Sequence, residues 1–558
     1  MFPQRDRRSF TLLVGWSLFF SVTVLAVAGQ WLLRNDLPDG YQNEFIHLFT
    51  LGEIWFRLRD AGLDEAWPFL WDEYYPPLLH APAALAMSVF GRDRVVATLA
   101  LGVWIIPLLC ATAGLARAAA KSAWAGAWAV VLLACAPAIF GGVRRYEPNV
   151  ALAACVALAL WWLSRGGLKG SREAAVFGVI CASGLLIDRL VFAVYLAIPT
   201  LLLMARYRRA RRWLLAGAVT LAGAGYFYTR FVLLHSEEIT SQFGGEIRAD
   251  GESGDGFSLL SLRGFLYYPL SWVDGGMGLL PVLVTLVGCG LWIARGRARA
   301  EKDLVLVIES ALASGLILFT VLGKKQPYYA IPLIAPAVVC ATAGWASWLP
   351  RSARVRSAVL IVITSLGVNQ LLFLSTGVGA LPFHGRAAVL AGASPLPSQF
   401  LGHEYVMAGP PFEQHLNLRR VAELCESVQP PEGSGDDITL LFSEGHAAYE
   451  GQVMPTLRLL LDTRRVPGML MEPQAWEESQ PLAHCFVYIS RDESRSWPKR
   501  ASIEPVFSQW NYDPPTPGLM SALEAAKARS ELLDTWSSAL DEYVHVYALV
   551  GARVDAPE

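Results

Sequence analysis

Three side chains near the N-terminus have types and spacing that could transfer a proton or hold a cation. Asp39, Glu44 and His47 lie close together, and a helix starting at Gln42 would place Glu44 and His47 on one face. A carboxylate can accept the proton of an attacking hydroxyl, and a carboxylate beside a histidine can bind a divalent cation. No strict spacing rule is met, so the alternative is a solvated, charged loop.

These residues belong to a polar stretch, Arg34 to His80, that separates two apolar runs. Connections of this length are usually functional or disordered. Two apolar-periodic pieces and Pro76-Pro77 predict an ordered one. Tyr74 and Tyr75 suit a substrate cleft, or a helix entrance in the aromatic belt of a membrane. We therefore expect the stretch to form the acidic half of an active site at the outer face of a membrane.

The composition is that of a polytopic membrane protein. The chain has 558 residues, of which 54% are hydrophobic and 17% charged, whereas soluble domains carry about 25% charged residues. The net charge of −2 gives no indication of nucleic-acid binding. The first apolar run follows Arg5, Arg7 and Arg8 and is too long for a signal-peptide core, so it is expected to be a retained anchor.

Hydropathy predicts an all-α bundle of about eleven transmembrane helices over residues 1–379. Residues 174–205 could form one long span or two short ones, and basic flanks on both sides favour two. The predicted spans lie near residues 10–33, 95–117, 122–141, 148–164, 173–188, 189–205, 213–234, 278–296, 303–323, 328–349 and 357–378.

Basic clusters predict the orientation of the bundle. Most arginine and lysine clusters fall on one side of the predicted spans, which the positive-inside rule makes cytoplasmic. The N-terminus is then cytoplasmic and the C-terminal region extracytoplasmic. Such a chain suits a bacterial inner membrane. The predicted outer connections are residues 34–80, 144–148, 235–269 and 324–327.

Several basic residues fall on the predicted outer side, against this trend. They are Arg144 with Arg145, Lys324 with Lys325, and Arg230. One interpretation is a bound anion, since arginine and lysine clamp phosphate oxygens. The other is snorkelling to lipid headgroups. Three such positions on one face favour the anion.

Residues 380–558 differ in character and are expected to form a small extracytoplasmic α/β domain. Strands are predicted at 438–444, 484–490 and 543–551, with a helix over 449–462. Cys425 and Cys485 are the only cysteines in this region and could pair in an oxidising compartment. The acidic, Gly- and Ser-rich connection at 235–269 is either a flexible loop or a lid over substrate.

Five motifs occur in order between Phe10 and Val378: PDGYQNEFIHL, YYPPLLHAPAALAMSVFG, RRYEPNVALAACVALALWWL, GLLIDRLVFAVYLAIPTLLL and KKQPYYAIPLIAPAV. With them the chain resembles the GT-C superfamily of integral-membrane glycosyltransferases, on the branch of protein O-mannosyltransferases and the aminoarabinose transferase of lipid A. That branch commonly has an Asp-Glu pair where Asp39 precedes Gly40, which leaves Asp36, Asp39 and Glu44 open as the base. Where relatives often carry a lysine, Asp188-Arg189 stands here, and Arg189 would keep the positive charge.

The resemblance implies a many-helix fold with a re-entrant outer loop and a polyprenyl-phosphate-linked sugar donor. The expected protein is an inverting glycosyltransferase that moves the sugar from this donor to a lipid, glycan or protein acceptor. The cofactor stays open, with a divalent cation as the candidate. The expected roles are general base for Asp39; second base or metal ligand for Glu44; metal ligand for His47; phosphate binding for Arg144, Arg145, Arg189, Lys324 and Lys325; and cleft lining for Tyr74, Tyr75, Tyr328 and Tyr329.

The sequence disfavours two other classes of protein. A transporter or flippase of lipid-linked sugars should show ionisable residues at mid-membrane and related halves of the chain, and neither is clear in this sequence. A membrane-anchored interaction protein would need far fewer spans than the roughly eleven that hydropathy predicts. The sequence therefore favours the transferase.

Overall fold

The computed structural model is mainly helical. It describes residues 4–34, 42–165, 168–188, 191–237, 262–321, 327–376, 417–428, 440–443, 460, 485–490, 530–537 and 543–549. The chain divides into two compact units. The first contains Met1–Gly29, Trp67–Pro82 and Thr98–Pro410, and the second contains Gln30–Ala66, Ala83–Ala97 and Pro411–Glu558.

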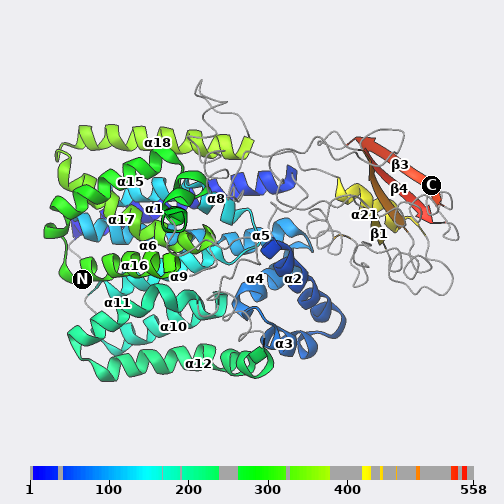
Figure 1. The fold of residues 1–558 in the computed structure, drawn as a ribbon, viewed down its shortest axis with the longest axis horizontal. Coiled ribbons are helices and arrows are strands. Elements are labelled where there is room, and N and C mark those ends of the chain that lie inside the picture. Colours follow the sequence, from blue (N-terminus) through cyan, green and yellow to red (C-terminus); the bar gives the residue numbers. More distant parts are fainter. Residues whose placement is uncertain are drawn as a thin grey trace. The chain divides into compact units, whose positions relative to one another are not determined.

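Long apolar sequence runs form most of the helices, because a helix satisfies its own backbone hydrogen bonds and can bury apolar side chains all round. Each of the eleven predicted runs overlaps one or more helices (Figure 1). The helices are α1 Gln4–Arg34, α5 Arg94–Gly102, α6 Ile105–Ala120, α7 Ala123–Ala134, α8 Pro137–Val143, α9 Asn149–Leu163, α10 Ser171–Asp188, α11 Val191–Tyr207, α12 Ala210–Leu234, α14 Leu262–Ser271, α15 Leu279–Leu291, α16 Lys302–Val321, α17 Ile331–Trp348 and α18 Ala353–Thr376.

Six helical segments in the described part of the chain are long and apolar enough to cross a membrane, or seven if the bent pair α7–α8 counts as one span. Three shorter apolar helices, Pro77–Phe90, Asn149–Leu163 and Val191–Tyr207, fall below that length. These helices make the protein an integral membrane protein. The count of about eleven spans stays a prediction. Residues 174–205 form two helices, α10 and α11, as the basic flanks favoured.

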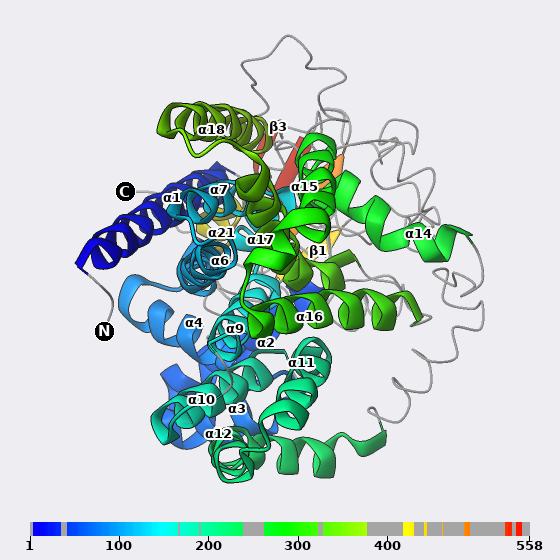
Figure 2. The ribbon, with the colours of Figure 1, turned by 90° about the vertical axis from the view of Figure 1, so that its left-hand side faces the viewer.

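Helix α17 lies at the centre of the first unit. In the apolar segment Tyr328–Trp348, which contains α17, 89% is buried, whereas in the segment Ala353–Leu372 of α18 only 11% is buried. Helix α17 packs against α6, α7, α9, α15 and α16 (Figure 2). Gly344 of α17 lies so close to Gly288 of α15 that an added Cβ would meet the Gly288 carbonyl oxygen at 1.9 Å. Small residues let membrane helices approach in this way. Helix α18 is therefore peripheral, and α17 forms the core.

The polar stretch from Arg34 to His80 is largely helical. It contains α2 (Gln42–Ala61) and α3 (Leu63–Asp72), and α4 (Pro77–Phe90) begins at the second proline. A proline at a helix start has no backbone N–H that would need an intrahelical partner. The prediction of an ordered connection therefore agrees with the residues described. Asp36 and Asp39 lie outside them.

The second unit contains a four-stranded mixed sheet in the order β1-β2-β4-β3. Strands β1 and β2 are parallel, and the other two pairs are antiparallel. Strands β1, β2 and β4 fall where the sequence predicts strands, whereas β3 was missed because SELLDTWS does not alternate apolar and polar residues. Of the predicted helix at 449–462, only Leu460 lies inside the described residues. The bounds are β1 Leu440–Ser443, β2 Cys485–Ser490, β3 Ser530–Ser537 and β4 Tyr543–Leu549.

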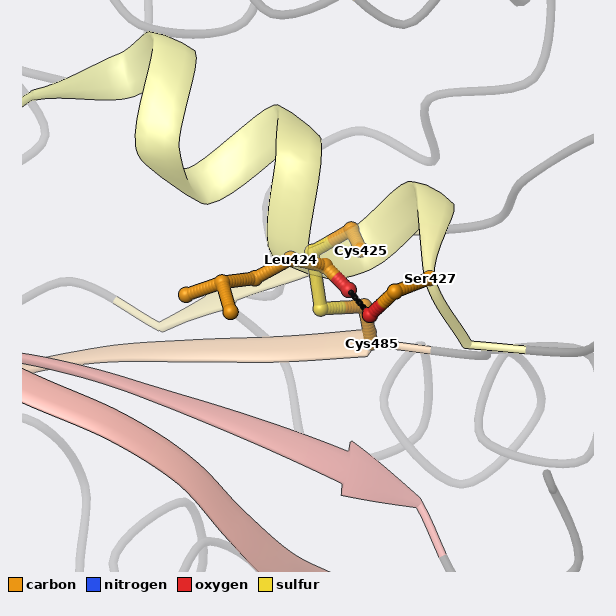
Figure 3. The surroundings of a disulfide bond; sticks show 4 residues. All are labelled: Leu424, Cys425, Ser427 and Cys485. Carbon is orange, nitrogen blue, oxygen red and sulfur yellow. Dashed lines mark hydrogen bonds between the residues drawn. A yellow bond between two sulfur atoms is a disulfide. The ribbon is translucent and has the colours of Figure 1, made fainter. Parts of the chain in front are cut away.

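Helix α21 (Leu418–Glu426) is joined to this sheet by a disulfide. Cys425 near its end bonds Cys485, the first residue of β2 (Figure 3), and both are fully buried. The sequence left this pairing open. Disulfides persist in oxidising compartments, and the extracytoplasmic location of this region stays a prediction.

Replacing Cys425 by serine is expected to destabilise the second unit by about 4 kcal/mol, because the bond closes a chain segment of 60 residues in the unfolded state. Thermal unfolding followed by limited proteolysis of the purified protein measures the loss. Cys110→Ser, at a free and half-buried cysteine, is the control and should leave this proteolysis unchanged. Alkylation of both tail thiols in the unreduced, exported protein would contradict the bond.

Candidate functional site

Glu44 and His47 lie on α2, in the second unit, and both side chains are buried. The Glu44 Oε1 atom accepts a hydrogen bond of 3.3 Å from Nη2 of Arg94, whose side chain is only 4% exposed. A carboxylate and a guanidinium away from water stabilise each other, whereas either one alone would be strongly destabilising. Glu44 is therefore one half of a buried ion pair, whatever further chemistry it has.

The sequence did not indicate Arg94 as a partner for Glu44. The two residues are 50 positions apart, and Arg94 begins α5, beyond the complete helices α3 and α4. The predicted metal role of Glu44 and His47 stays a prediction. Among the residues that the structure describes, no group of three or more His, Cys, Asp or Glu side chains could hold a metal ion.

In the first unit, Asp72 at the end of α3 is clamped by the end of α12. Arg230 donates from Nε to Oδ1 at 2.7 Å and from Nη2 to Oδ2 at 2.5 Å. His235 Nε2 lies 2.9 Å from the Asp72 carbonyl oxygen, so this ring nitrogen carries the proton and donates it. Two parallel bonds fix both distance and orientation. The anion expected for Arg230 is thus a carboxylate of the protein itself.

Tyr74 and Tyr75 follow this clamp and pack on aromatic neighbours. The Tyr74 ring lies 5.6 Å from that of Phe231 and 5.5 Å from that of His235. The Tyr75 ring lies 5.3 Å from Tyr74 and 6.4 Å from His80. Edge-to-face contacts at these separations stabilise aromatic pairs. The two tyrosines therefore connect α12 to the first turn of α4.

His80 and Tyr146 form a buried polar pair. The Nδ1 atom of His80 lies 3.1 Å from the Tyr146 hydroxyl, and that hydroxyl donates to the Leu79 carbonyl oxygen at 3.2 Å. A hydroxyl has one proton, so the Nδ1–H of His80 donates to Tyr146. Burial lowers the pKa of His80 to about 3 and raises the pKa of Tyr146 well above its ordinary value. Both groups are neutral at physiological pH.

Arg144 and Arg145 lie beside this pair, in the connection between α8 and α9. Their side chains are 0% and 7% exposed, and the Arg144 guanidinium lies 5.3 Å from the Phe140 ring centre. Glu147, in the same connection, accepts a hydrogen bond of 2.5 Å from Asn149. Two buried cations and one buried carboxylate within four residues make a positive segment, which suits an anionic ligand.

Tyr328 and Tyr329 lie in the short helix η4 (Pro327–Ala330) that precedes α17. The Tyr195 hydroxyl donates to the Tyr329 carbonyl oxygen at 2.7 Å, and the Tyr329 ring stacks on Phe319 at 5.2 Å. Tyr328 lies 4.8 Å from Tyr329, ring centre to ring centre. This aromatic cluster joins α11, α16 and η4. The remaining predicted phosphate ligands, Arg189, Lys324 and Lys325, are outside the described residues.

Within the first unit these contacts form one continuous series from Arg230 through Asp72, the two tyrosines and His80 to Tyr146. The sequence placed Tyr74, Tyr75 and Arg144 among the candidates, but it did not pair Asp72 with Arg230 or His80 with Tyr146. The signal available in the sequence was a charged residue at a predicted helix end, such as Asp72 or Arg230, which needs a partner of opposite charge. The choice of partner depends on which ends meet in space.

The arrangement is one of packed apolar helices with an ordered, polar first connection. Two crystal structures of ArnT, an aminoarabinose transferase from Cupriavidus metallidurans, share this fold, one bound to undecaprenyl phosphate and one in the apo state. The bound structure has 15% sequence identity and a TM-score of 0.54, and the apo structure has 13% and 0.58. Each match covers 98% of this chain and 99% of ArnT. No family model and no curated protein sequence matches the chain. The predicted resemblance is confirmed as a likeness of fold.

Removing one partner of the buried Glu44–Arg94 pair is expected to destabilise the protein by about 3–5 kcal/mol, since a buried charge is left without its counter-charge. Arg94→Met and Glu44→Leu should each lower the melting temperature in detergent. The double variant should recover most of the loss. A double variant as unstable as the sum of the single ones would contradict the pairing.

Acid stability should depend on His80. The unfolded chain protonates this histidine near pH 6.5, whereas the folded state resists protonation down to about pH 3. Its contribution to stability is therefore complete above pH 6.5 and is lost as the pH falls toward 3. Melting temperatures of His80→Asn should fall less steeply over that range. Tyr146→Phe, which keeps the histidine buried, is the control and should retain the wild-type slope; equal slopes for wild type and His80→Asn would refute the prediction.

Proposed function

We propose that the protein is an inverting glycosyltransferase that moves a sugar from a polyprenyl-phosphate-linked donor to an acceptor at the outer face of the membrane. The observation that carries the proposal is the ArnT fold over 98% of the chain, in a structure bound to undecaprenyl phosphate. A donor with a long apolar tail needs helices to hold the tail and cations to hold the phosphate. The charged and aromatic series of the first unit supports the second requirement.

Arg144 and Arg145 are the described residues best suited to the donor phosphate. Their guanidiniums are buried, so little water competes with a phosphate for them, and each can form two parallel bonds to its oxygens. Arg189, Lys324 and Lys325 are proposed to add positive charge. In the reaction the bond between the sugar C1 and the phosphate oxygen breaks. The phosphate then keeps the electron pair, and these cations stabilise its charge.

Asp39 is proposed as the general base. It would take the proton of the acceptor hydroxyl while that oxygen forms the new bond to C1 from the face opposite the phosphate. Glu44 suits this task less well than Asp39, because its charge is already paired with Arg94. Glu44 then helps to hold α2, and Asp39 stands just before that helix in the sequence. A bound divalent cation near Glu44 and His47 would add charge stabilisation.

The remaining parts of the proposal concern membrane placement. About eleven spans, a cytoplasmic N-terminus and an extracytoplasmic α/β domain over residues 380–558 would put the donor phosphate and the acceptor on the same side. The buried disulfide between Cys425 and Cys485 supports that side for the C-terminal domain. Tyr74, Tyr75, Tyr328 and Tyr329 are proposed to shape the donor and acceptor clefts.

Native mass spectrometry of the detergent-purified protein, combined with an assay for polyprenyl phosphate release, tests this function. Wild type should bind undecaprenyl phosphate more tightly than undecaprenol, which lacks the phosphate. In Arg144→Gln/Arg145→Gln the ratio of the affinities for undecaprenyl phosphate and undecaprenol should fall by roughly tenfold or more, because two charge-assisted contacts are removed. Asp39→Asn should keep the binding but release almost no polyprenyl phosphate from a polyprenyl-phosphate sugar.

Arg117→Gln, at the predicted cytoplasmic end of α6, is the matched control for the loss of an arginine. It should keep both binding and turnover. Melting temperatures separate lost binding from lost folding. Full turnover in Asp39→Asn would remove that residue as the base. Equal affinity of wild type for undecaprenyl phosphate and undecaprenol would remove the phosphate site itself.

A further inference from the structure

The turn between α11 and α12 is the most strongly basic short segment among the described residues. Five of the seven residues from Arg206 to Arg212 are arginine. The predicted orientation puts the turn on the cytoplasmic side, away from the donor site, so the proposed function makes no use of it. If these arginines served only to set the orientation of the helices in the membrane, their positive charge alone would suffice. The contacts within this turn are more specific than that.

Three of the five arginines hold the turn in place. Arg206 Nε lies 3.2 Å from Asp303 Oδ1 at the start of α16, and the Tyr207 hydroxyl donates to Oδ2 of the same carboxylate. Arg212 Nη1 donates to the Leu168 carbonyl oxygen at 3.0 Å, in the connection between α9 and α10. The Arg209 guanidinium lies 4.6 Å from the Tyr207 ring centre. The turn is thereby fixed to two neighbouring parts of the first unit.

The other two arginines, Arg208 and Arg211, are exposed. Neither side chain makes a hydrogen bond or an ion pair with the described part of the chain, although the Arg208 backbone N–H donates to the Met204 carbonyl oxygen. The backbone of Arg208 has a φ of +42°, a left-handed conformation that an arginine adopts only when surrounding contacts impose it. Two guanidiniums are thus presented on a supported turn, and Asp303, the carboxylate in contact with the turn, is already paired.

The helices on either side of the turn expose apolar side chains. Leu201, Leu202 and Met204 of α11 are 57%, 40% and 39% exposed, and Leu214 of α12 is 71% exposed. These positions lie within two helical turns of the arginines. Apolar side chains that continue into a pair of guanidiniums match a molecule with acyl chains and an anionic headgroup.

We propose that Arg208 and Arg211 form a binding site for the headgroup of an anionic glycerophospholipid in the membrane surrounding the protein. The phosphate of the lipid would accept hydrogen bonds from the two guanidiniums, and its acyl chains would lie along the exposed leucines. Basic sites between helix ends at the cytoplasmic surface bind such headgroups in this way. The inference does not depend on the transferase activity.

Native mass spectrometry of the full chain, titrated with phosphatidylglycerol and with phosphatidylcholine, tests the proposal. Wild type should prefer phosphatidylglycerol. Arg208→Gln/Arg211→Gln should lower that affinity by roughly 10- to 30-fold, on the basis of the usual contribution of each basic residue near a membrane surface. Arg208→Lys/Arg211→Lys keeps the charge but not the planar fork and should show an intermediate loss.

Arg351→Gln/Arg354→Gln is the matched control, because it removes the same charge from exposed arginines at the start of α18, on the same predicted side. This control should retain the wild-type affinity. An equal loss in both double variants would reduce the effect to diffuse charge and overturn the site, as would full binding in Arg208→Gln/Arg211→Gln. Displacement of the lipid by soluble glycerol phosphate at matched concentration would show a phosphate site that needs no lipid, and would overturn the lipid assignment.

Discussion

A charge placed among apolar helices must find its counter-charge inside the protein, and this constraint organises the polar part of the fold. Arg94 neutralises Glu44 where both are buried, and the partly exposed side chains of Arg230 and Asp72 are joined by two parallel bonds. Each pair joins segments that are distant in sequence, so each also fixes the position of a helix end. A neutral histidine, His80, avoids the problem, because burial keeps it uncharged.

The need of a buried charge for a counter-charge also applies to the segment that contains Arg144 and Arg145. Two guanidiniums there are buried next to the neutral pair of His80 and Tyr146. A segment with this charge suits an anionic ligand, and in the proposed function that ligand is the donor phosphate. The likeness of fold to ArnT and the local charge distribution are the two observations on which the proposed function rests.

Apolar packing provides the rigid frame on which these charges are placed. Helix α17 is buried on nearly all sides, and glycines let it approach α15 at backbone distance. Charged side chains such as Arg230 of α12 then lie on helices that pack onto this frame, with α12 against α10 and α10 against α9. The arginine turn between α11 and α12 follows the same principle, with Asp303 and the Leu168 carbonyl as its supports. In the second unit the disulfide between Cys425 and Cys485 fixes α21 to strand β2.

The sequence by itself determined that the chain is an integral membrane protein, where its apolar helices run, that three strands lie in the C-terminal region and that the chain resembles the GT-C fold. Hydropathy and local periodicity suffice for these features, because they depend on neighbours along the chain. The partners of Asp72, Glu44 and His80 were decided only by the tertiary structure. Several helix ends carry a complementary charge, and which of them meet depends on how whole helices pack. Strand β3, whose pattern is weak, likewise forms because β4 lies beside it.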